Sequence, residues 1–502
     1  MNGHLPNCRL DLCFTQSQMS AFQEISRDRN PLHTDPEYSR RTQFGRLVVY
    51  GVSGVLAGLG AWARGRQFEL GSVRAKFDKP LFVGEPYTIQ ISEAGEKAEI
   101  RILKGNQMHT RVRFTWRERN SDQLLPIHST GIFQPLSAAK EWDGKLEGLG
   151  KIKDSFPYEP DWHAVADFEK NFSLGASQIP HGQLCALLGS SYFVGMEIPG
   201  QQALFAELNF MFEPEITTER NFEFRALKVA YDDRFNLVTT SGTGTGIHSF
   251  QISAFRRPKP VLYNMKEIRD RVQESLDLKR KTVFISGGCR GFGGVLARAF
   301  ALQGANLALN YRSSRLEAGQ VQNELDQSRG EVMLVQGDVA VGMDCERMRD
   351  QVFSQFGKLD FLICNAVPQF ETNHFLAQTP AEFLANVQCP VAMCSQLLYW
   401  FLPQLNTGAT VVQVSTIATI EPVEQLGHYV AAKSAVEGLM RVLACEFKSI
   451  RFVIARPPRM LTDTTNLPYD LNNPVSAVDV AAKLVESLRG LDHGRNLFEI
   501  NL

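Results

Sequence analysis

The stretch Lys281-Thr-Val-Phe-Ile-Ser-Gly-Gly-Cys-Arg-Gly-Phe-Gly293 joins a short apolar run directly to a set of closely spaced glycines. The apolar run predicts a buried strand, and the glycines predict a tight turn at the start of a helix. Backbone N–H groups of such a turn point toward a pyrophosphate, and the helix N-terminus favours negative charge. The segment therefore predicts a dinucleotide-binding turn that contains Gly287, Arg290, Gly291 and Gly293.

Four apolar runs follow this turn, with helical stretches between them. They cover residues 307–311, 332–336, 361–364 and 410–414. Strands that alternate with helices predict an α/β fold with a parallel, doubly wound, Rossmann-like sheet. Ligands bind at the carboxyl edge of such sheets. We therefore expect one site that includes the polar residues just after three of these runs, Asp338, Asn365 and Ser415.

Tyr429 and Lys433 are four residues apart in a predicted helix over residues 428–447. This spacing places both side chains on one helix face. A tyrosine hydroxyl titrates at about 10 in model peptides, and a nearby ammonium favours its phenolate form. The pair therefore predicts proton transfer at a substrate oxygen.

Residues 281–502 resemble the short-chain dehydrogenases/reductases, and are similar to their β-ketoacyl thioester reductases. The resemblance implies that Tyr429 exchanges a proton with the substrate oxygen and that Ser415 orients this oxygen. It implies that Lys433 lowers the Tyr429 pKa and holds the nicotinamide ribose. It also implies that Asn386 anchors a water molecule that relays protons.

Two further residues match cofactor-binding positions of that family. Asp338 resembles the residue that contacts the adenine, and Asn365 matches the asparagine of the usual Asn-Ala-Gly motif. Val367 stands here in place of the glycine, so the loop shape differs. Arginine after the second strand accommodates a ribose 2′-phosphate, whereas a carboxylate binds the free hydroxyl. Because Arg312 follows that strand and Arg290 lies in the glycine turn, we predict NADPH.

The amino-terminal half contains a second motif, in which an aspartate, an asparagine, a proline and a histidine are closely spaced at Asp28, Asn30, Pro31 and His33. Addition or removal of water next to a thioester needs a base at the α-carbon and an acid at the β-oxygen. An aspartate and a histidine on one loop supply both groups. The alternative is a purely structural role, in which Asp28 and Asn30 cap a turn and His33 only forms a hydrogen bond within the loop.

Residues 1–135 resemble the MaoC-like (R)-specific enoyl thioester hydratases, which have the hot-dog fold. The resemblance implies that Asp28 and His33 are the acid and base and that Asn30 orients them. It also implies that a backbone N–H near Gly51, at the start of the central helix, stabilises an enolate oxygen. Tyr50 stands where many relatives carry histidine, so the activity of this half is less certain than its fold.

Residues 150–260 are similar to a second, divergent copy of the hot-dog unit, with His181 at its helix entrance. No Asp-x-Asn-Pro-x-His motif precedes that helix, and we predict that this copy is noncatalytic. We thus expect an α+β double hot-dog region, a linker at residues 261–280, and the Rossmann-like domain at residues 281–502.

The amino-acid composition bears on the binding partners and the cellular compartment that can be expected. The chain has 502 residues, 44% of them hydrophobic, a net charge of -1 and a pI of about 6.8. The chain has no excess of basic residues, so its composition gives no reason to expect binding to nucleic acid or to a membrane surface. The nine cysteines have no paired spacing, which argues against a metal site or disulfides and favours a reducing compartment. We expect a cytoplasmic protein, and the resemblance to short-chain reductases implies a homo-oligomer.

The two predicted sites catalyse adjacent steps. The two resemblances together imply that NADPH reduces a 3-ketoacyl thioester and that the 3-hydroxyacyl product loses water to give a 2-enoyl thioester, as in fatty acid or polyketide biosynthesis. We expect the acyl group on an acyl carrier protein, with CoA as the alternative. One alternative function is hydration and oxidation of an enoyl-CoA, as in β-oxidation. Another is a ketoreductase whose hot-dog region is a catalytically silent binding or dimerisation module.

Overall fold

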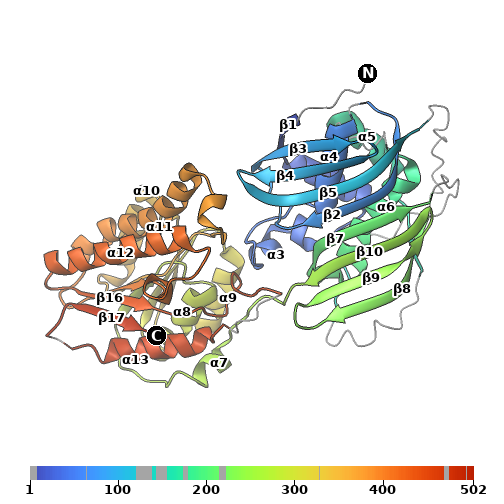
Figure 1. Cartoon of the computed structure of the whole chain (residues 1–502). Coiled ribbons are helices and arrows are strands. Elements are labelled where there is room, and N and C mark those ends of the chain that lie inside the picture. Colours follow the sequence, from blue (N-terminus) through green and yellow to red (C-terminus); the bar gives the residue numbers. More distant parts are fainter. Residues whose placement is uncertain are drawn as a thin grey trace. The chain divides into compact units, whose positions relative to one another are not determined.

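The chain divides into two compact units (Figure 1). The computed structural model describes residues 8–63, 65–119, 138–142, 155–172, 179–213, 222–326, 328–468, 474–492 and 494–502. The first unit consists of residues 1–259 and 467–471, and the second of residues 260–466 and 472–502. The expected linker therefore belongs to the second unit, where helix α7 (Met265–Arg269) packs Ile268 into the core.

The first unit contains one antiparallel sheet with the strand order β1-β3-β4-β5-β2-β7-β10-β9-β8-β6. The strands are β1 (Cys8–Cys13), β2 (Phe68–Phe77), β3 (Pro86–Ala94), β4 (Lys97–Lys104), β5 (Gln107–Glu118), β6 (Ser155–Tyr158), β7 (Ala203–Phe212), β8 (Phe222–Asp232), β9 (Leu237–Gly244) and β10 (Ile247–Arg256). The order of β1 to β5 is repeated by β6 to β10, and β2 pairs with β7 at the join. Two copies of one five-stranded unit thus share a continuous sheet.

Each copy wraps its strands around a central helix. The helical segments are α1 (Gln16–Ser26), α2 (Pro31–Thr34), α3 (Pro36–Arg40), α4 (Gly51–Ala63), α5 (Trp162–Phe172), α6 (His181–Tyr192), a π-helical turn η3 (Phe193–Glu197) and a short 3₁₀ turn η4 (Gly200–Gln202). Helices α4 and α6 are buried almost throughout, as expected of helices that are apolar on all sides. This arrangement confirms the predicted double hot-dog region.

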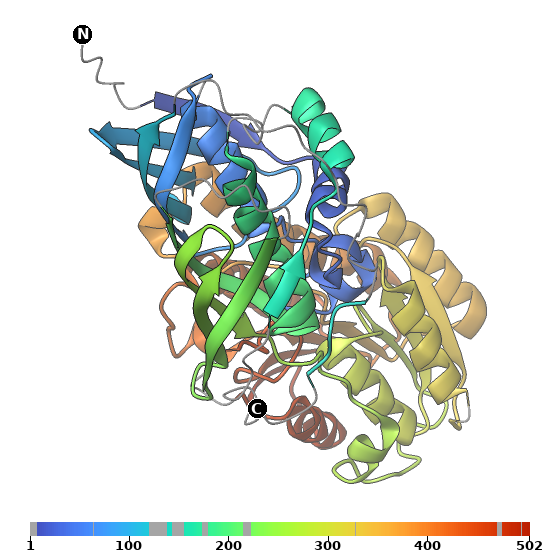
Figure 2. The same ribbon diagram turned by 90° about the vertical axis from the view of Figure 1, so that its right-hand side faces the viewer.

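The second unit contains a parallel sheet of seven strands in the order β13-β12-β11-β14-β15-β16-β17. The strands are β11 (Thr282–Ile285), β12 (Asn306–Tyr311), β13 (Val332–Gln336), β14 (Phe361–Cys364), β15 (Thr410–Val414), β16 (Arg451–Arg456) and β17 (Leu497–Asn501). The sheet order and its parallel pairing confirm the predicted Rossmann-like fold. Figure 2 shows the strands of both sheets from a second direction.

Helices cover both faces of this parallel sheet (Figure 1). They are α8 (Gly291–Leu302), α9 (Arg315–Leu325), α10 (Gly342–Phe356), α11 (Pro380–Phe401), α12 (Gly427–Glu446) and α13 (Ala477–Arg489), with short turns η5 (Phe375–Ala377), η6 (Leu402–Gln404) and η7 (Ile417–Thr419). One buried core lies on each face. Within the described ranges, no helix combines the length and the apolar character needed to cross a membrane.

Candidate active sites

The glycine turn between β11 and α8 has the shape of a phosphate cradle. Gly287 and Gly291 have positive φ angles of 63° and 52°, which favour glycine. A Cβ on Gly293 would overlap the Gly287 carbonyl oxygen. The side chain of Asn310 accepts a hydrogen bond from the Gly287 N–H at 3.2 Å and so fixes the turn. Helix α8 has no side-chain cap, so its first N–H groups remain available for an anion.

The carboxyl ends of the neighbouring strands complete the cofactor edge, by which we mean the glycine turn and the strand ends beside it. The Asn365 side chain donates to the carbonyl oxygens of Ser286 and Gly287 at 3.0 and 3.3 Å, which ties β14 to the glycine turn. Arg312 and Asp338 form an ion pair of 3.3 Å, and the Arg312 side chain is 70% exposed. Arg290 is also exposed, directly before α8. The four predicted cofactor segments therefore meet at the carboxyl edge of the sheet.

Tyr429 and Lys433 lie together on α12, as their spacing predicts. The Lys433 ammonium lies 5.7 Å from the centre of the Tyr429 ring and donates to the Val414 carbonyl oxygen at 2.7 Å. Burial lowers the pKa of Lys433 to about 8. Burial also raises the pKa of Tyr429 to about 12. The neutral phenol is therefore the resting form, as a proton donor requires.

The hydroxyl that contacts Tyr429 belongs to Thr416. A hydrogen bond from the Thr416 side chain acts to lower the Tyr429 pKa, against the larger effect of burial. Ser415, which we predicted for this position, is 2% exposed and donates its hydroxyl hydrogen to Glu437 at 2.6 Å. Side chains alternate along an extended strand end, so neighbouring residues point in opposite directions. The structure therefore favours Thr416 over Ser415 as the neighbour of the tyrosine.

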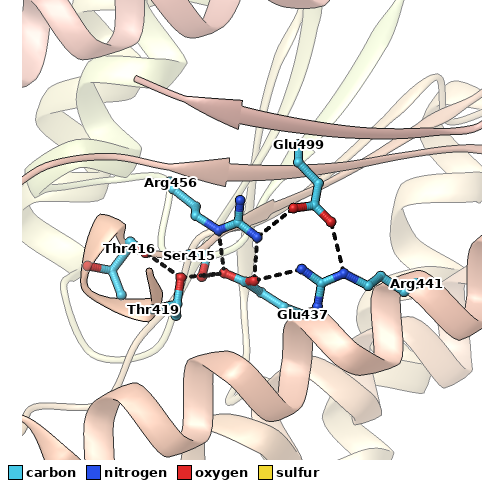
Figure 3. A network of polar contacts seen from close by, with 7 residues as sticks. All are labelled: Ser415, Thr416, Thr419, Glu437, Arg441, Arg456 and Glu499. Carbon is cyan, nitrogen blue, oxygen red and sulfur yellow. Dashed lines mark hydrogen bonds and ion pairs between the residues drawn. The ribbon is translucent and has the colours of Figure 1, made fainter. Parts of the chain in front are cut away.

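Ser415 belongs to a buried polar network below the site (Figure 3). Glu437 accepts hydrogen bonds from Ser415 and from Thr419, at 2.6 and 2.9 Å, and pairs with Arg456 at 2.6 Å. The Thr416 carbonyl oxygen also lies 2.9 Å from the Thr419 hydroxyl, whose single hydrogen is shared between this oxygen and Glu437. Burial acts to raise the Glu437 pKa, but these hydrogen bonds and the arginine hold it below its usual value. Glu437 thus fixes both ends of the turn that carries Thr416.

The outer part of this network joins two more elements. Glu499 of β17 pairs with Arg456 and with Arg441, both at 2.8 Å, and Arg441 reaches Glu437 at 3.2 Å. Figure 3 shows the carboxylates of Glu437 and Glu499 between the two guanidinium groups. The network therefore links α12 to β16 and β17. The sequence motifs did not reveal Glu437, although it lies four residues beyond Lys433 on the same helix face.

A cavity of about 110 Å³ lies beside the tyrosine, and its polar lining includes Asn386, His428 and Tyr429. Asn386 donates to the Gln378 side-chain oxygen at 3.3 Å. Phe370 stacks on the Tyr429 ring, with 4.4 Å between ring centres. The structure thus brings the predicted Asn386 and Tyr429 to one cavity, and it adds the aromatic wall and His428, which the sequence motifs did not reveal.

In the first unit, Asp28 and Asn30 are held by the second hot-dog copy. The Ser191 hydroxyl of α6 donates to Asp28 Oδ2 at 2.7 Å, and the Asn30 N–H donates to Oδ1 at 3.0 Å. Asn30 donates to the carbonyl oxygens of Gly195 and Gly200, both at 2.9 Å. A Cβ on Gly195 would clash with the Asp28 carboxylate. The second copy therefore supports the motif loop.

His33 has a defined orientation. Its Nδ1 lies 2.7 Å from the Val48 carbonyl oxygen, and only a protonated Nδ1 can donate there, which leaves Nε2 as the lone-pair nitrogen. Tyr50 stacks on the imidazole at 4.1 Å and donates to the Asp28 carbonyl oxygen at 2.8 Å. Tyr50 therefore joins the two halves of the motif, in a position where we noted a departure from the related hydratases.

Burial shifts the two titratable groups in opposite directions. It raises the pKa of Asp28 to about 7, against hydrogen bonds from Ser191 and Asn30. It also lowers the pKa of His33, which is about 4 once the opposing hydrogen bond to Val48 and the small lowering effect of the Arg257 guanidinium are included. A carboxyl that holds its proton near a neutral imidazole is a typical acid and base pair.

Gly51 begins α4, so its N–H has no partner within the helix. A Cβ on Gly51 would touch the Phe77 ring, which explains the need for glycine. In the second copy, His181 begins α6 and packs against Trp162 at 5.0 Å. Residues 172–177 replace the motif there, and all of them except Phe172 lie outside the described residues.

Two family models match the chain. Residues 281–470 match the short chain dehydrogenase model, and residues 3–114 match the MaoC like domain. The chain joins a MaoC-like domain to a short chain dehydrogenase domain. This confirms both resemblances seen in the sequence.

The dehydrogenase domain has curated relatives. The oxidoreductase YhdF of Bacillus subtilis is 27% identical over 167 residues, which are 33% of this chain and 58% of YhdF. The 3β-hydroxysteroid dehydrogenase 1 of Eggerthella lenta is 28% identical over 191 residues, which are 37% and 73% of the two chains. The 11-β-hydroxysteroid dehydrogenase-like 2 of Arabidopsis thaliana is 32% identical over 193 residues, or 37% and 61%. The chain thus spans less than two thirds of the length of two of these three relatives.

Among solved structures, a short chain dehydrogenase from Burkholderia cenocepacia in complex with NADP is 24% identical. It covers 45% of this chain and 98% of its own length, with a TM-score of 0.41.

Proposed function

We propose that this protein reduces a 3-ketoacyl thioester with NADPH and then dehydrates the 3-hydroxyacyl thioester to a 2-enoyl thioester. The observation that supports the proposal is that one chain contains both a tyrosine–lysine pair and an aspartate–histidine pair. Tyr429 is a neutral phenol beside Thr416 and Lys433, and Asp28 and His33 have oppositely shifted pKa values. Fusion would keep the intermediate at a high effective concentration.

For the reduction, the glycine turn fits the pyrophosphate of a dinucleotide, and Lys433 fits a ribose hydroxyl. When bound, the nicotinamide cofactor supplies hydride to the ketone carbon. Thr416 and Tyr429 hold the ketone oxygen, and the Tyr429 phenol gives its proton to that oxygen. Lys433 stabilises the phenolate that remains, and a water held at Asn386 returns a proton. The exposed Arg312 and Arg290 would bind the 2′-phosphate, which is the basis for NADPH.

For the dehydration, His33 Nε2 takes a proton from the α-carbon of the 3-hydroxyacyl thioester. The Gly51 N–H stabilises the negative charge that develops on the thioester oxygen. Protonated Asp28 gives its proton to the departing hydroxyl group, which leaves as water. Asn30 keeps the loop in place through the second hot-dog copy.

The test uses three proteins and one substrate. Wild type, Tyr429→Phe and His33→Ala are incubated with a 3-ketoacyl thioester and NADPH, and the acyl products are identified by mass spectrometry. We expect enoyl thioester from wild type, unchanged substrate from Tyr429→Phe and accumulated 3-hydroxyacyl thioester from His33→Ala. The same assay with acyl carrier protein and CoA substrates decides the carrier.

One observation favours a second candidate function, a ketoreductase with a silent hot-dog module. Tyr50 covers one face of the His33 ring, and this limits access to the imidazole. If wild type stops at the 3-hydroxyacyl thioester and His33→Ala gives the same product, the hot-dog region is not catalytic. The dehydratase proposal would then be wrong.

A further inference from the structure

Two loops beside the cavity at Tyr429 expose large apolar side chains to solvent. These side chains are Val367, Phe375, Leu376 and Val423, with exposed fractions of 45%, 69%, 81% and 55%. Single exposed apolar residues are common on protein surfaces, whereas a group of them beside a cavity indicates a binding surface. We call these four residues the apolar rim.

The first loop of the apolar rim begins at the cavity wall, because Val367 lines the cavity. Further along this loop, the Phe375 ring contacts the Phe383 ring, with 5.4 Å between ring centres. The Phe383 ring in turn contacts the imidazole of His428 at 6.5 Å, and His428 also lines the cavity. The rim is therefore continuous with the cavity through contacts between side chains.

The second loop of the apolar rim carries Val423 and leads into α12, the helix of the catalytic tyrosine. A backbone hydrogen bond joins it to the first loop, since the Asn373 N–H donates to the Gln425 carbonyl oxygen at 2.9 Å. Asn373 precedes Phe375 by two residues, and Gln425 follows Val423 by two residues. The exposed side chains of both loops therefore belong to one surface region beside the site.

The cavity itself has room only for the reacting end of a substrate. Its volume is about 110 Å³. Pockets that enclose a drug-sized ligand measure roughly 300–1,000 Å³. A long acyl chain must therefore extend beyond the cavity, and the apolar rim is continuous with the cavity wall. Contact between an acyl chain and exposed apolar side chains removes both surfaces from water and favours binding.

We propose that the reductase site selects medium- and long-chain acyl thioesters, with the ketone at Tyr429 and the apolar tail across the apolar rim. The assignment rests on the proposed ketone reduction and adds the chain length that the site prefers. A short acyl chain ends within the cavity and leaves the rim in water. Contacts of the tail are the same in the bound substrate and in the transition state, so they act mainly on KM.

The experiment compares kcat/KM for 3-ketobutyryl-CoA and 3-ketododecanoyl-CoA, both with NADPH and at concentrations below those at which the longer thioester forms micelles. Wild type is compared with the double variant Leu376→Ser and Val423→Ser, because both side chains are more than half exposed and their loss leaves the core intact. We expect wild type to favour the longer substrate by roughly tenfold to a hundredfold, since each covered methylene group strengthens binding by up to about fourfold. The double variant should lower kcat/KM for the longer substrate roughly three- to tenfold, through KM, and leave the shorter substrate unaffected.

Leu227→Ser is the matched control, because Leu227 is 58% exposed on β8 of the first unit and its loss should leave the ratio of the two kcat/KM values unchanged. Light scattering of wild type and of the double variant tests a different occupant of the rim, a second copy of this chain. A lower mass of the double variant together with an unchanged ratio would assign the rim to a contact between copies and overturn the inference.

Two further results separate the inference from the proposed function. Equal kcat/KM values for both substrates in wild type would overturn the chain-length preference while leaving ketone reduction intact. If wild type reduces neither thioester, the proposed function is wrong, and the inference falls with it.

Discussion

The two sites differ in the origin of the groups that support them. In the dehydrogenase domain, Tyr429, Lys433 and Glu437 follow one another on successive turns of α12, so one helix carries three residues of the site. In the MaoC-like domain, Asp28 is held by Ser191, which lies in the other hot-dog copy. A site on one helix can be recognised from spacing within a motif. A site completed by a second copy depends on a contact between distant segments.

The largest expected effect tests the site that depends on both copies. Asp28→Asn should lower the dehydration rate by roughly 10²- to 10⁴-fold, because the amide cannot act as a general acid. For wild type, we expect dehydration to require a neutral His33 and a protonated Asp28. Its kcat/KM should therefore rise with pH through about 4 and fall above about 7. The rate of enoyl product formation from a 3-hydroxyacyl thioester measures the loss in Asp28→Asn and, at a series of pH values, the profile of wild type.

The same substitution affects stability in a pH-dependent way. The folded-state pKa of Asp28 is raised above its ordinary value, so folding favours the protonated form. This contribution is complete below pH 4 and is lost as the pH rises through about 7. Asp28→Asn should therefore stabilise the first unit at pH 8 by roughly 4 kcal/mol and have a much smaller effect at pH 4. Calorimetry at both pH values tests this, and equal shifts would contradict the buried acid.

The next effect tests the neighbour of Tyr429. Thr416→Ala should lower the reduction rate roughly a hundredfold, because a donor to the substrate oxygen is lost. Thr416→Ser should retain most of the activity. Ser415→Ala is the matched control and should have a smaller effect, because this hydroxyl binds Glu437. Steady-state NADPH oxidation gives the rates, and a larger loss in Ser415→Ala would restore our sequence prediction.

Glu437→Gln tests the buried network. It leaves Arg456 without its closest carboxylate, and we expect the free energy of unfolding of the dehydrogenase unit to fall by about 3 kcal/mol. The Thr416 turn loses its anchor, so kcat should fall roughly tenfold while KM for NADPH stays constant. Glu499→Gln keeps the Glu437–Arg456 pair and should affect kcat less. Equal kcat values for the two variants would contradict the positioning role.

Ser191→Ala tests the support from the second copy. The Ser191 hydrogen bond acts to lower the Asp28 pKa, so its loss should move the alkaline limb of the dehydration profile to higher pH. We expect the rate to fall roughly three- to tenfold as the carboxyl loses its orientation. Ser190→Ala is the matched control, since the Ser190 hydroxyl donates to the Leu187 carbonyl oxygen in the same helix. An unchanged profile in Ser191→Ala would show that the contact does not tune the acid.

Arg312→Ala tests the cofactor edge and has the smallest expected effect. Arg312 is exposed and already paired with Asp338, so solvent weakens its interactions. We expect KM for NADPH to rise roughly threefold to tenfold and KM for NADH to change little. A wild-type preference for NADH, or equal changes for both cofactors, would remove the basis for NADPH.

The sequence predicted the strands, the glycine turn and the Tyr429–Lys433 pair because each depends on local periodicity. It missed Thr416 because neighbouring side chains at a strand end point in opposite directions, and a shift of one residue exchanges them. It missed Ser191 because contacts between α6 and the motif loop have no local signal. The apolar rim depends on a contact between two loops that are distant in the sequence, which only the folded chain provides.

The central claim is that one chain carries out reduction and dehydration at two separate sites. A mixture of Tyr429→Phe and His33→Ala proteins tests it directly, with a 3-ketoacyl thioester and NADPH as substrates. We predict that the mixture forms the 2-enoyl thioester, whereas Tyr429→Phe alone consumes no NADPH and His33→Ala alone stops at the 3-hydroxyacyl thioester. Enoyl product from either variant alone, or none from the mixture, would contradict the account.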